Sequence, residues 1–137
     1  MRPDWEAWAL GVAAAVATRA DCTRRQVGAV VLDQHHRVLS VGYNGAPSGA
    51  PGCLTAGACP RGRQNAVQVA PGSSYDTGPG ACISLHAEQN ALLYADPLRT
   101  RGGLLAITHE PCDGCRRFIT GTGIARVVWP GGQWDLA

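Results

Sequence analysis

Residues 27–43 have the sequence VGAVVLDQHHRVLSVGY, and this stretch decides the fold. Two apolar runs, Val27 to Leu32 and Val38 to Tyr43, lie on either side of the polar tetrapeptide Asp33-Gln34-His35-His36. Apolar runs rich in β-branched residues and separated by a polar tetrapeptide are typical of an antiparallel hairpin. We therefore predict two neighbouring strands here, and we expect both histidines of the turn to be solvated rather than bound to metal.

The residues around this hairpin predict alternating helices and strands. The first helix should be substantially buried, because its middle is apolar around most of its circumference. The second should end before Pro97, because a proline disfavours a helical residue ahead of it. The expected elements are a helix from Pro3 to about Ala20, a helix from Leu85 to about Ala95, a strand from Leu104 to Thr108, a helix from Asp113 to about Thr120, a strand from Ala125 to Trp129, and a short tail after Pro130-Gly131-Gly132.

This order of elements favours an α/β protein with a three-layer α/β/α architecture and a mixed sheet of four to five strands. The chain has 137 residues, of which 45% are hydrophobic and 16% charged, so we expect one domain over residues 1–137. No apolar run approaches the roughly 20 residues of a membrane-spanning helix. No cleavable signal is recognisable at the N-terminus, which predicts a soluble, cytoplasmic protein.

The segment from about residue 44 to 84 differs in composition from the rest of the chain. It is rich in Gly, Pro, Ser and Ala and has almost no hydrophobic period. An insert of this length inside a compact domain needs something to hold it in place, or else carries function. Cys53, Cys59 and Cys82 are the obvious candidates for holding it.

Two short motifs carry the chemistry: His86-Ala87-Glu88 and Pro111-Cys112-Asp113-Gly114-Cys115. One imidazole and two thiolates are the three protein ligands of a catalytic zinc, with a fourth position left for water. Glu88 is two residues beyond His86, about 200° around a helix, so we expect it to move protons rather than to bind the same ion. An H-x-E followed by P-C-x-x-C is the signature of zinc-dependent nucleobase deaminases. The alternative is a closed structural zinc site, with His86 and Glu88 as ordinary residues of a helix.

The net charge of the chain is +2. A protein that binds polymeric nucleic acid usually carries a basic stripe and aromatic residues for stacking, so such a partner is not expected. The arginines occur instead in local pairs, such as Arg24-Arg25 and Arg116-Arg117, which suit a small phosphate. A small-molecule nucleotide is therefore the expected partner.

Four segments resemble the deoxycytidylate (dCMP) deaminase family within the cytidine-deaminase-like superfamily: residues 22–31 (CTRRQVGAVV), 42–49 (GYNGAPSG), 86–92 (HAEQNAL) and 108–115 (THEPCDGC). The resemblance implies hydrolysis of dCMP to dUMP and ammonia. It also implies that Asn44 bonds the sugar or the base and that Arg24 and Arg25 meet the 5′-phosphate. From the residues alone, the two arginines could instead belong to a solvated loop, and Asn44 could supply a left-handed turn before Gly45.

Relatives in this family often carry a second zinc, bound in this insert by a His-Cys pair and two later cysteines. Cys53, Cys59 and Cys82 match those cysteines, whereas Gly52 stands in the place of the histidine. Cys22 could complete the set, or the three thiols could bind no metal. A second, structural zinc is thus left open.

The C-terminus departs from the family pattern. The resemblance implies a further helix and strand after Trp129, where relatives often have tyrosine, but this chain stops at Ala137. The resemblance also implies a symmetric homo-oligomer, and it raises the question of control by dCTP or dTTP. The leading alternative function is the same reaction on another amino-bearing base, such as CMP, a free nucleoside, a modified pyrimidine or a specialised metabolite. A non-catalytic zinc-binding module is a more remote alternative.

Overall fold

The structure is a computed structural model that describes residues 1–22, 25–46 and 84–136. Within these residues five strands form one mixed sheet in the order β2-β1-β3-β4-β5. Strand β1 is antiparallel to β2 and β3, β3 is parallel to β4, and β4 is antiparallel to β5. The elements are α1 (Trp5–Ala17), β1 (Gly28–Leu32), β2 (Val38–Tyr43), α2 (Ala87–Leu93), α3 (Pro97–Thr100), β3 (Leu104–Ile107), α4 (Asp113–Thr120), β4 (Arg126–Trp129) and β5 (Gly132–Asp135).

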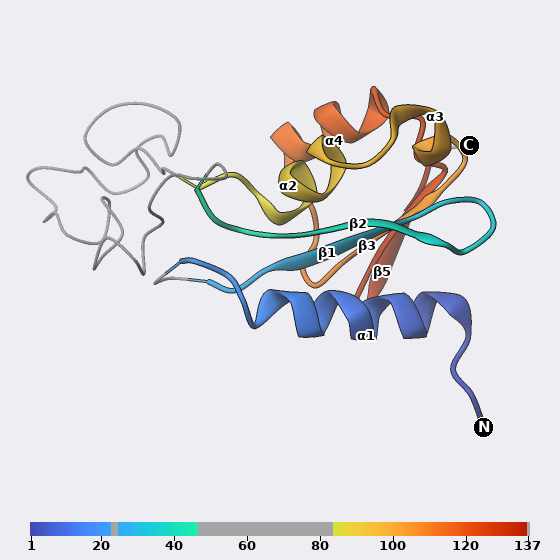
Figure 1. The fold of residues 1–137 in the computed structure, drawn as a ribbon, viewed down its shortest axis with the longest axis horizontal. Helices are drawn as coiled ribbons and strands as arrows, with labels where there is room; N and C mark the ends of the chain where they lie inside the picture. The colour runs from blue at the N-terminus through green and yellow to red at the C-terminus, as the bar shows by residue number, and fades with distance from the viewer. Residues whose placement is uncertain (23–24, 47–83, 137) are drawn as a thin grey trace, which may run out of the picture.

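Helices cover both faces of the sheet, as Figure 1 shows: α1 lies on one side and α2 and α4 on the other. All five residues of β1 are buried, because the strand is central and has helices over both of its faces. Its side chains alternate between two cores. Ala29 and Val31 pack with α2 and α4, whereas Val30 and Leu32 pack with α1. The predicted three-layer α/β/α fold and the hairpin of residues 27–43 are confirmed.

Two glycines let the helices lie directly on the strands. A Cβ atom on Gly42 of β2 would overlap the backbone of α2 at Ala87 and Ala91. A Cβ atom on Gly28 of β1 would overlap the backbone of α1 at Ala13 and Ala17. Helix backbone therefore touches strand backbone on both faces of the sheet, which fixes where each helix begins relative to the strand ends.

Helix α1 is shorter and more exposed than its sequence suggested. It begins after Asp4, whose carboxylate accepts a 2.8 Å hydrogen bond from the Ala7 N–H. Only Ala9, Ala13 and Ala17 are buried within the helix, while Trp5 remains 52% exposed. The prediction of a substantially buried helix is wrong, because β1 and its neighbours cover one narrow face and the described residues offer nothing to the others.

The C-terminus was expected to be a tail and is instead strand β5. Gly131 takes a positive φ of 89°, which turns the chain back after Trp129. The new strand pairs antiparallel with β4, and Trp134 lies opposite Val127. Arg126 binds the Asp135 carboxylate at 2.6 Å, so side chains as well as backbone hold the edge of the sheet.

The turn between β1 and β2 also differs from expectation at one histidine. Asp33 is buried, and its carboxylate accepts hydrogen bonds from the N–H groups of His35 and Arg37 and from the guanidinium of Arg99. These bonds, that of Arg37 first, lower the pKa of Asp33 although its burial opposes them. His36 is half-buried rather than fully solvated: it has a φ of 65°, and its ring stacks on the Trp5 indole at 4.5 Å.

The described helices include none that is long and apolar enough to cross a membrane.

Replacing Gly42 with alanine should force α2 away from β2. We expect Gly42→Ala to lower the free energy of unfolding by about 1–3 kcal/mol, the usual effect of overpacking, and to weaken zinc binding. Gly11→Ala is the matched control, because no atom lies within 4 Å of a Cβ at that position. It should raise the free energy of unfolding by about 0.5–1 kcal/mol through helix propensity. Urea unfolding of both variants measures the effects, and equal stability of the two would contradict the close contact.

Candidate metal centre

Three side chains converge at the end of the sheet where β3 finishes, in an arrangement that fits a zinc ion. The Nδ1 atom of His86 lies 3.0 Å from the Sγ of Cys115 and 3.6 Å from the Sγ of Cys112. All three atoms lie within 4.8 Å of one another. With Zn–S bonds of about 2.3 Å and Zn–N bonds of about 2.0 Å, tetrahedral ligands are separated by roughly 3.6 Å. The donor types and the spacing therefore both suit zinc, and three protein ligands leave one position for water.

The ends of two helices present these ligands. His86 is the residue before α2, and its N–H donates a 2.8 Å hydrogen bond to the Gln89 side-chain oxygen. Cys112 stands in the equivalent place before α4, and Cys115 lies in the first turn of that helix. The first turn of a helix has unpaired N–H groups and a partial positive charge, which favour thiolate over thiol.

Glu88 lies in the first turn of α2 beside these ligands. Its side chain is nearly inaccessible, since the residue is 3% exposed. Burial raises its pKa, and interactions with its own backbone, with His86 and with Cys115 oppose that rise. A carboxyl group with a raised pKa can both accept and return a proton near neutral pH.

Cys115 is equally buried, and it belongs to the core beneath α2 and α4. Burial raises the pKa of its thiol, and the carboxylate of Glu88 and the neighbouring Cys112 raise it further. A cation bound at this place would favour the ionised thiol, because the interior offers little solvation for its negative charge.

Arg25 approaches the same place from the segment before β1. Arg25 is exposed. Its positive charge opposes the rise in the pKa of Glu88 and adds to the lowering of the pKa of His109. Arg24 lies outside the described residues, so its predicted role gains no structural information.

Asn44 forms four hydrogen bonds with the segment that precedes β1. Its side-chain oxygen accepts from the Val27 N–H at 2.8 Å, and its Nδ2 donates to the Arg25 carbonyl at 2.8 Å. Its backbone N–H donates to the Val27 carbonyl, and its carbonyl accepts from the Asp21 N–H. Its φ is negative, because among the described residues His36 is the only non-glycine residue with a positive φ. The alternative of a left-handed turn at Asn44 is therefore wrong.

Three polar residues near the site received no role from the sequence. Thr108 Oγ1 accepts a hydrogen bond from the Gly28 N–H at 3.1 Å and lies 2.8 Å from Nδ1 of His109. Burial, then the charge of Arg25, lowers the pKa of His109. Asn90 is the third, and it bonds the end of β2. The available signal was position: Thr108 and His109 stand just before the Cys112 motif, and Asn90 just after Glu88.

The proposed second zinc gains no test. Cys53, Cys59 and Cys82 lie outside the described residues. Cys22 is half-buried and does not belong to the cluster of His86, Cys112 and Cys115.

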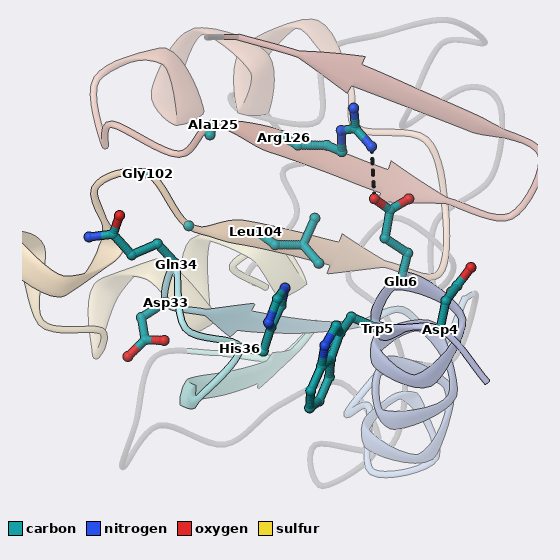
Figure 2. Close-up of a pocket in the computed structure, with 11 residues that line it drawn as sticks. Asp4, Trp5, Glu6, Asp33, Gln34, His36, Gly102, Leu104, Ala125 and Arg126 are labelled. Atoms are coloured by element: carbon teal, nitrogen blue, oxygen red, sulfur yellow. Dashed lines mark hydrogen bonds and ion pairs between the residues drawn. The ribbon is translucent and has the colours of Figure 1, made fainter. Parts of the chain in front are cut away.

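A cavity of about 460 Å³ lies at the opposite end of the sheet (Figure 2). Leu104 and Arg126, which line it, begin β3 and β4, whereas Cys112 and Cys115 follow the end of β3. Its charged side chains already bind other groups: Glu6 pairs with Arg126 at 2.8 Å, as the dashed line in Figure 2 shows, and Asp33 pairs with Arg99. We therefore assign the functional site to the metal cluster rather than to this cavity.

Comparison with known proteins agrees with that choice. Residues 3–130 match the family model described as the cytidine and deoxycytidylate deaminase zinc-binding region. The chain belongs to this family. The match to a zinc-binding region, together with the cluster of His86, Cys112 and Cys115, confirms the prediction that the protein uses zinc. The protein is therefore a zinc-dependent deaminase.

Two curated relatives and two solved structures show how far the similarity extends. The deoxycytidylate deaminase of Mycobacterium phage D29 is 50% identical over 130 residues, which cover 94% of this chain and 96% of that protein. The deoxycytidylate deaminase of Schizosaccharomyces pombe is 40% identical, over 93% of this chain but 37% of its own length. The chain thus spans little more than a third of the yeast relative.

The crystal structure of dCMP deaminase from the cyanophage S-TIM5 in complex with dCMP and dUMP has a TM-score of 0.66 and 27% identity, over 94% of this chain and 82% of that one. A mutant cytidine deaminase from Mycobacterium tuberculosis has a TM-score of 0.56 at 19% identity, over 98% of this chain and 90% of that one. The second likeness shows the shared fold alone.

Zinc binding should release protons, because the Cys115 thiol is protonated in the metal-free protein and must ionise to bind zinc. The raised pKa keeps the thiol protonated at neutral pH in the metal-free protein. We expect about one to two protons released per zinc and an affinity that falls as the pH is lowered from about 8 to 6. Calorimetric titration in buffers of different ionisation enthalpy counts these protons. Cys112→Ser should bind zinc more weakly and release one proton fewer, whereas pH-independent binding would contradict thiolate ligation.

Proposed function

We propose that this deaminase converts dCMP to dUMP and ammonia. The observation that carries the proposal is the buried Glu88 beside His86, Cys112 and Cys115. A structural zinc site does not require a buried carboxyl group, whereas deamination requires a group that transfers protons. The substrate is supported by the phage relative with 50% identity, which is named deoxycytidylate deaminase. The S-TIM5 dCMP deaminase was crystallised with dCMP and dUMP, which supports the same nucleotide pair.

The proposed chemistry needs one metal and one carboxyl group. His86, Cys112 and Cys115 would hold the zinc, which would act as a Lewis acid and make water a better nucleophile near neutral pH. Glu88 takes a proton from the attacking water and delivers it to N3 of the cytosine ring. It then passes the second proton to the departing amino group. The bond from C4 to the amino nitrogen breaks, the water oxygen becomes O4 of uracil, and ammonia leaves.

The raised pKa of Glu88 suits this shuttle. A carboxylate of ordinary pKa would hold a proton too weakly at neutral pH to donate it to a ring nitrogen. Burial removes water from the carboxyl group and so keeps proton transfer between Glu88 and the substrate.

The nucleotide's phosphate and sugar are assigned to the segment around residues 24–27 and to Asn44. The main chain of Arg25 is bonded to Asn44, and the guanidinium of an arginine matches a phosphate with two parallel hydrogen bonds. Arg24 remains its predicted partner. Asn44 uses one Nδ2 hydrogen for the Arg25 carbonyl, which leaves the second for the sugar or the base.

We further propose a cytoplasmic homo-oligomer. Thiolate ligands persist in a reducing compartment. Large apolar side chains are exposed on α1 at Trp5 and Trp8 and on the opposite layer at Tyr94 and Phe118, which supports contact between copies. Sedimentation of the zinc-loaded protein decides the oligomeric state.

Glu88→Gln should keep zinc and lose turnover. The amide preserves size but cannot carry protons, so we expect kcat to fall by about 10²–10⁴-fold with one zinc still bound. Glu110→Gln is the matched control, since that carboxylate is exposed and pairs with Arg116 at 3.5 Å. It should retain turnover. Normal turnover by Glu88→Gln would sink the mechanism.

An ammonia-release panel tests the substrate: dCMP, CMP, deoxycytidine, cytosine and guanine. We expect the largest kcat/KM for dCMP, and a value for deoxycytidine lower by about 10- to 100-fold, because a hydrogen bond to a charged group contributes about 1.5–3 kcal/mol. Equal values for dCMP and deoxycytidine would remove Arg24 and Arg25 from the phosphate role. A larger value for another base would establish the alternative deaminase, and zinc binding without any deamination would establish the non-catalytic module.

A further inference from the structure

Asn90, two residues beyond Glu88 on α2, bonds the end of strand β2. Its Nδ2 donates to the Tyr43 carbonyl at 2.8 Å and lies 3.4 Å from the Gly45 carbonyl. Asparagine is a poorer helix former than alanine, so these bonds offset a local cost. They tie the helix that carries His86 and Glu88 to residues 43–45.

A second contact holds the same three residues. Gly45 and Leu85 exchange two backbone hydrogen bonds, of 3.2 Å and 2.8 Å, immediately before His86. Residues 43 and 45 are thus hydrogen-bonded to α2 and to Leu85, the residue before His86. The residue between them is Asn44.

Asn44 transmits this attachment to the segment before β1. Its side chain bonds the backbone of Arg25 and Val27, and its carbonyl accepts from the Asp21 N–H. The position of the Arg25 main chain is therefore set by Asn44, and that of Asn44 by its two neighbours. A continuous path of hydrogen bonds runs from α2 through residues 43–45 to residue 25.

We infer that Asn90 is a positioning residue for substrate binding: through Asn44 it places Arg25 relative to Glu88 and the metal ligands. This inference rests on the proposed function, in which Arg25 meets the substrate phosphate. Asn90 itself touches backbone and not the reacting atoms.

The kinetic test is Asn90→Ala against Leu93→Ala, a control on the same helix whose side chain is 60% exposed. For Asn90→Ala we expect KM for dCMP to rise about tenfold, kcat to change by less than about threefold, and zinc content to stay the same. KM for deoxycytidine, which lacks the phosphate, should change little. Leu93→Ala should leave all four quantities unchanged. A loss of kcat alone, or an equal loss for both substrates, would overturn the inference in favour of a structural role.

A double-mutant cycle with Arg25→Ala tests whether Asn90 acts through Arg25. If it does, Asn90→Ala costs about tenfold in the wild-type background and little once Arg25 is gone. Additive losses would mean that Asn90 acts independently of Arg25, and the inference would fall.

A readout that needs no substrate separates this inference from the proposed function. The Val27 N–H is bonded to the Asn44 side chain, so its hydrogen exchange reports on the path. In zinc-loaded Asn90→Ala this exchange should be faster than in Leu93→Ala. Unchanged exchange overturns the inference even if dCMP is the substrate, whereas failure of the wild type to act on dCMP overturns the proposed function and leaves the exchange result to decide the path.

Discussion

The backbone contact between α2 and β2 at Gly42 is the constraint on which the site depends. Because no side chain lies between helix and strand, α2 begins beside the end of β2. That end is also where β1 begins and β3 finishes, given the pairing of Gly28 with Tyr43 and of Ala29 with Ile107. The chain leaving β3 enters α4 at the same edge. His86 and the two cysteines therefore meet at this end of the sheet.

The burial of two ionisable groups at this end of the sheet favours the binding of a cation. Glu88 and Cys115 are both almost inaccessible, and burial raises the pKa of each. In the metal-free chain the carboxylate of Glu88 opposes ionisation of the Cys115 thiol. A divalent ion reverses that relation for the thiols, which become ligands, and stabilises the folded state in proportion to its binding. Metal affinity, proton release and stability are thus linked in one small region.

The hydrogen bonds of Asn44 and Asn90 add a polar framework to the apolar cores. Each side-chain amide bonds main-chain groups that no strand or helix would otherwise pair, which is the usual use of such groups when they are partly buried. The framework spans α2, the end of β2 and the start of β1, and so joins the metal side of the site to the side assigned to the nucleotide. The cavity beside Trp5 lies at the other end of the sheet, where paired charges leave little for a ligand to bind.

Local sequence determined the elements whose signals are local. The hairpin of residues 27–43, the helices after His86 and Cys112, and the donor set for zinc all followed from periodicity and residue type. Strand β5 did not, because its pairing depends on Trp134 packing against the core and on Asp135 reaching Arg126. The exposure of α1 did not either, since a helix's apolar faces do not reveal how many of them the fold will cover.

The sequence by itself thus determined which atoms can bind zinc and which carboxyl group stands beside them. Only the tertiary structure decided that Asn44 bonds Val27, 17 residues away, and that Asn90 bonds the Tyr43 carbonyl, 47 residues away. Hydrogen bonds between residues distant in the sequence depend on strand register and on the close approach of α2 to β2. Those are set by the packing of the whole sheet and not by any single stretch of the chain.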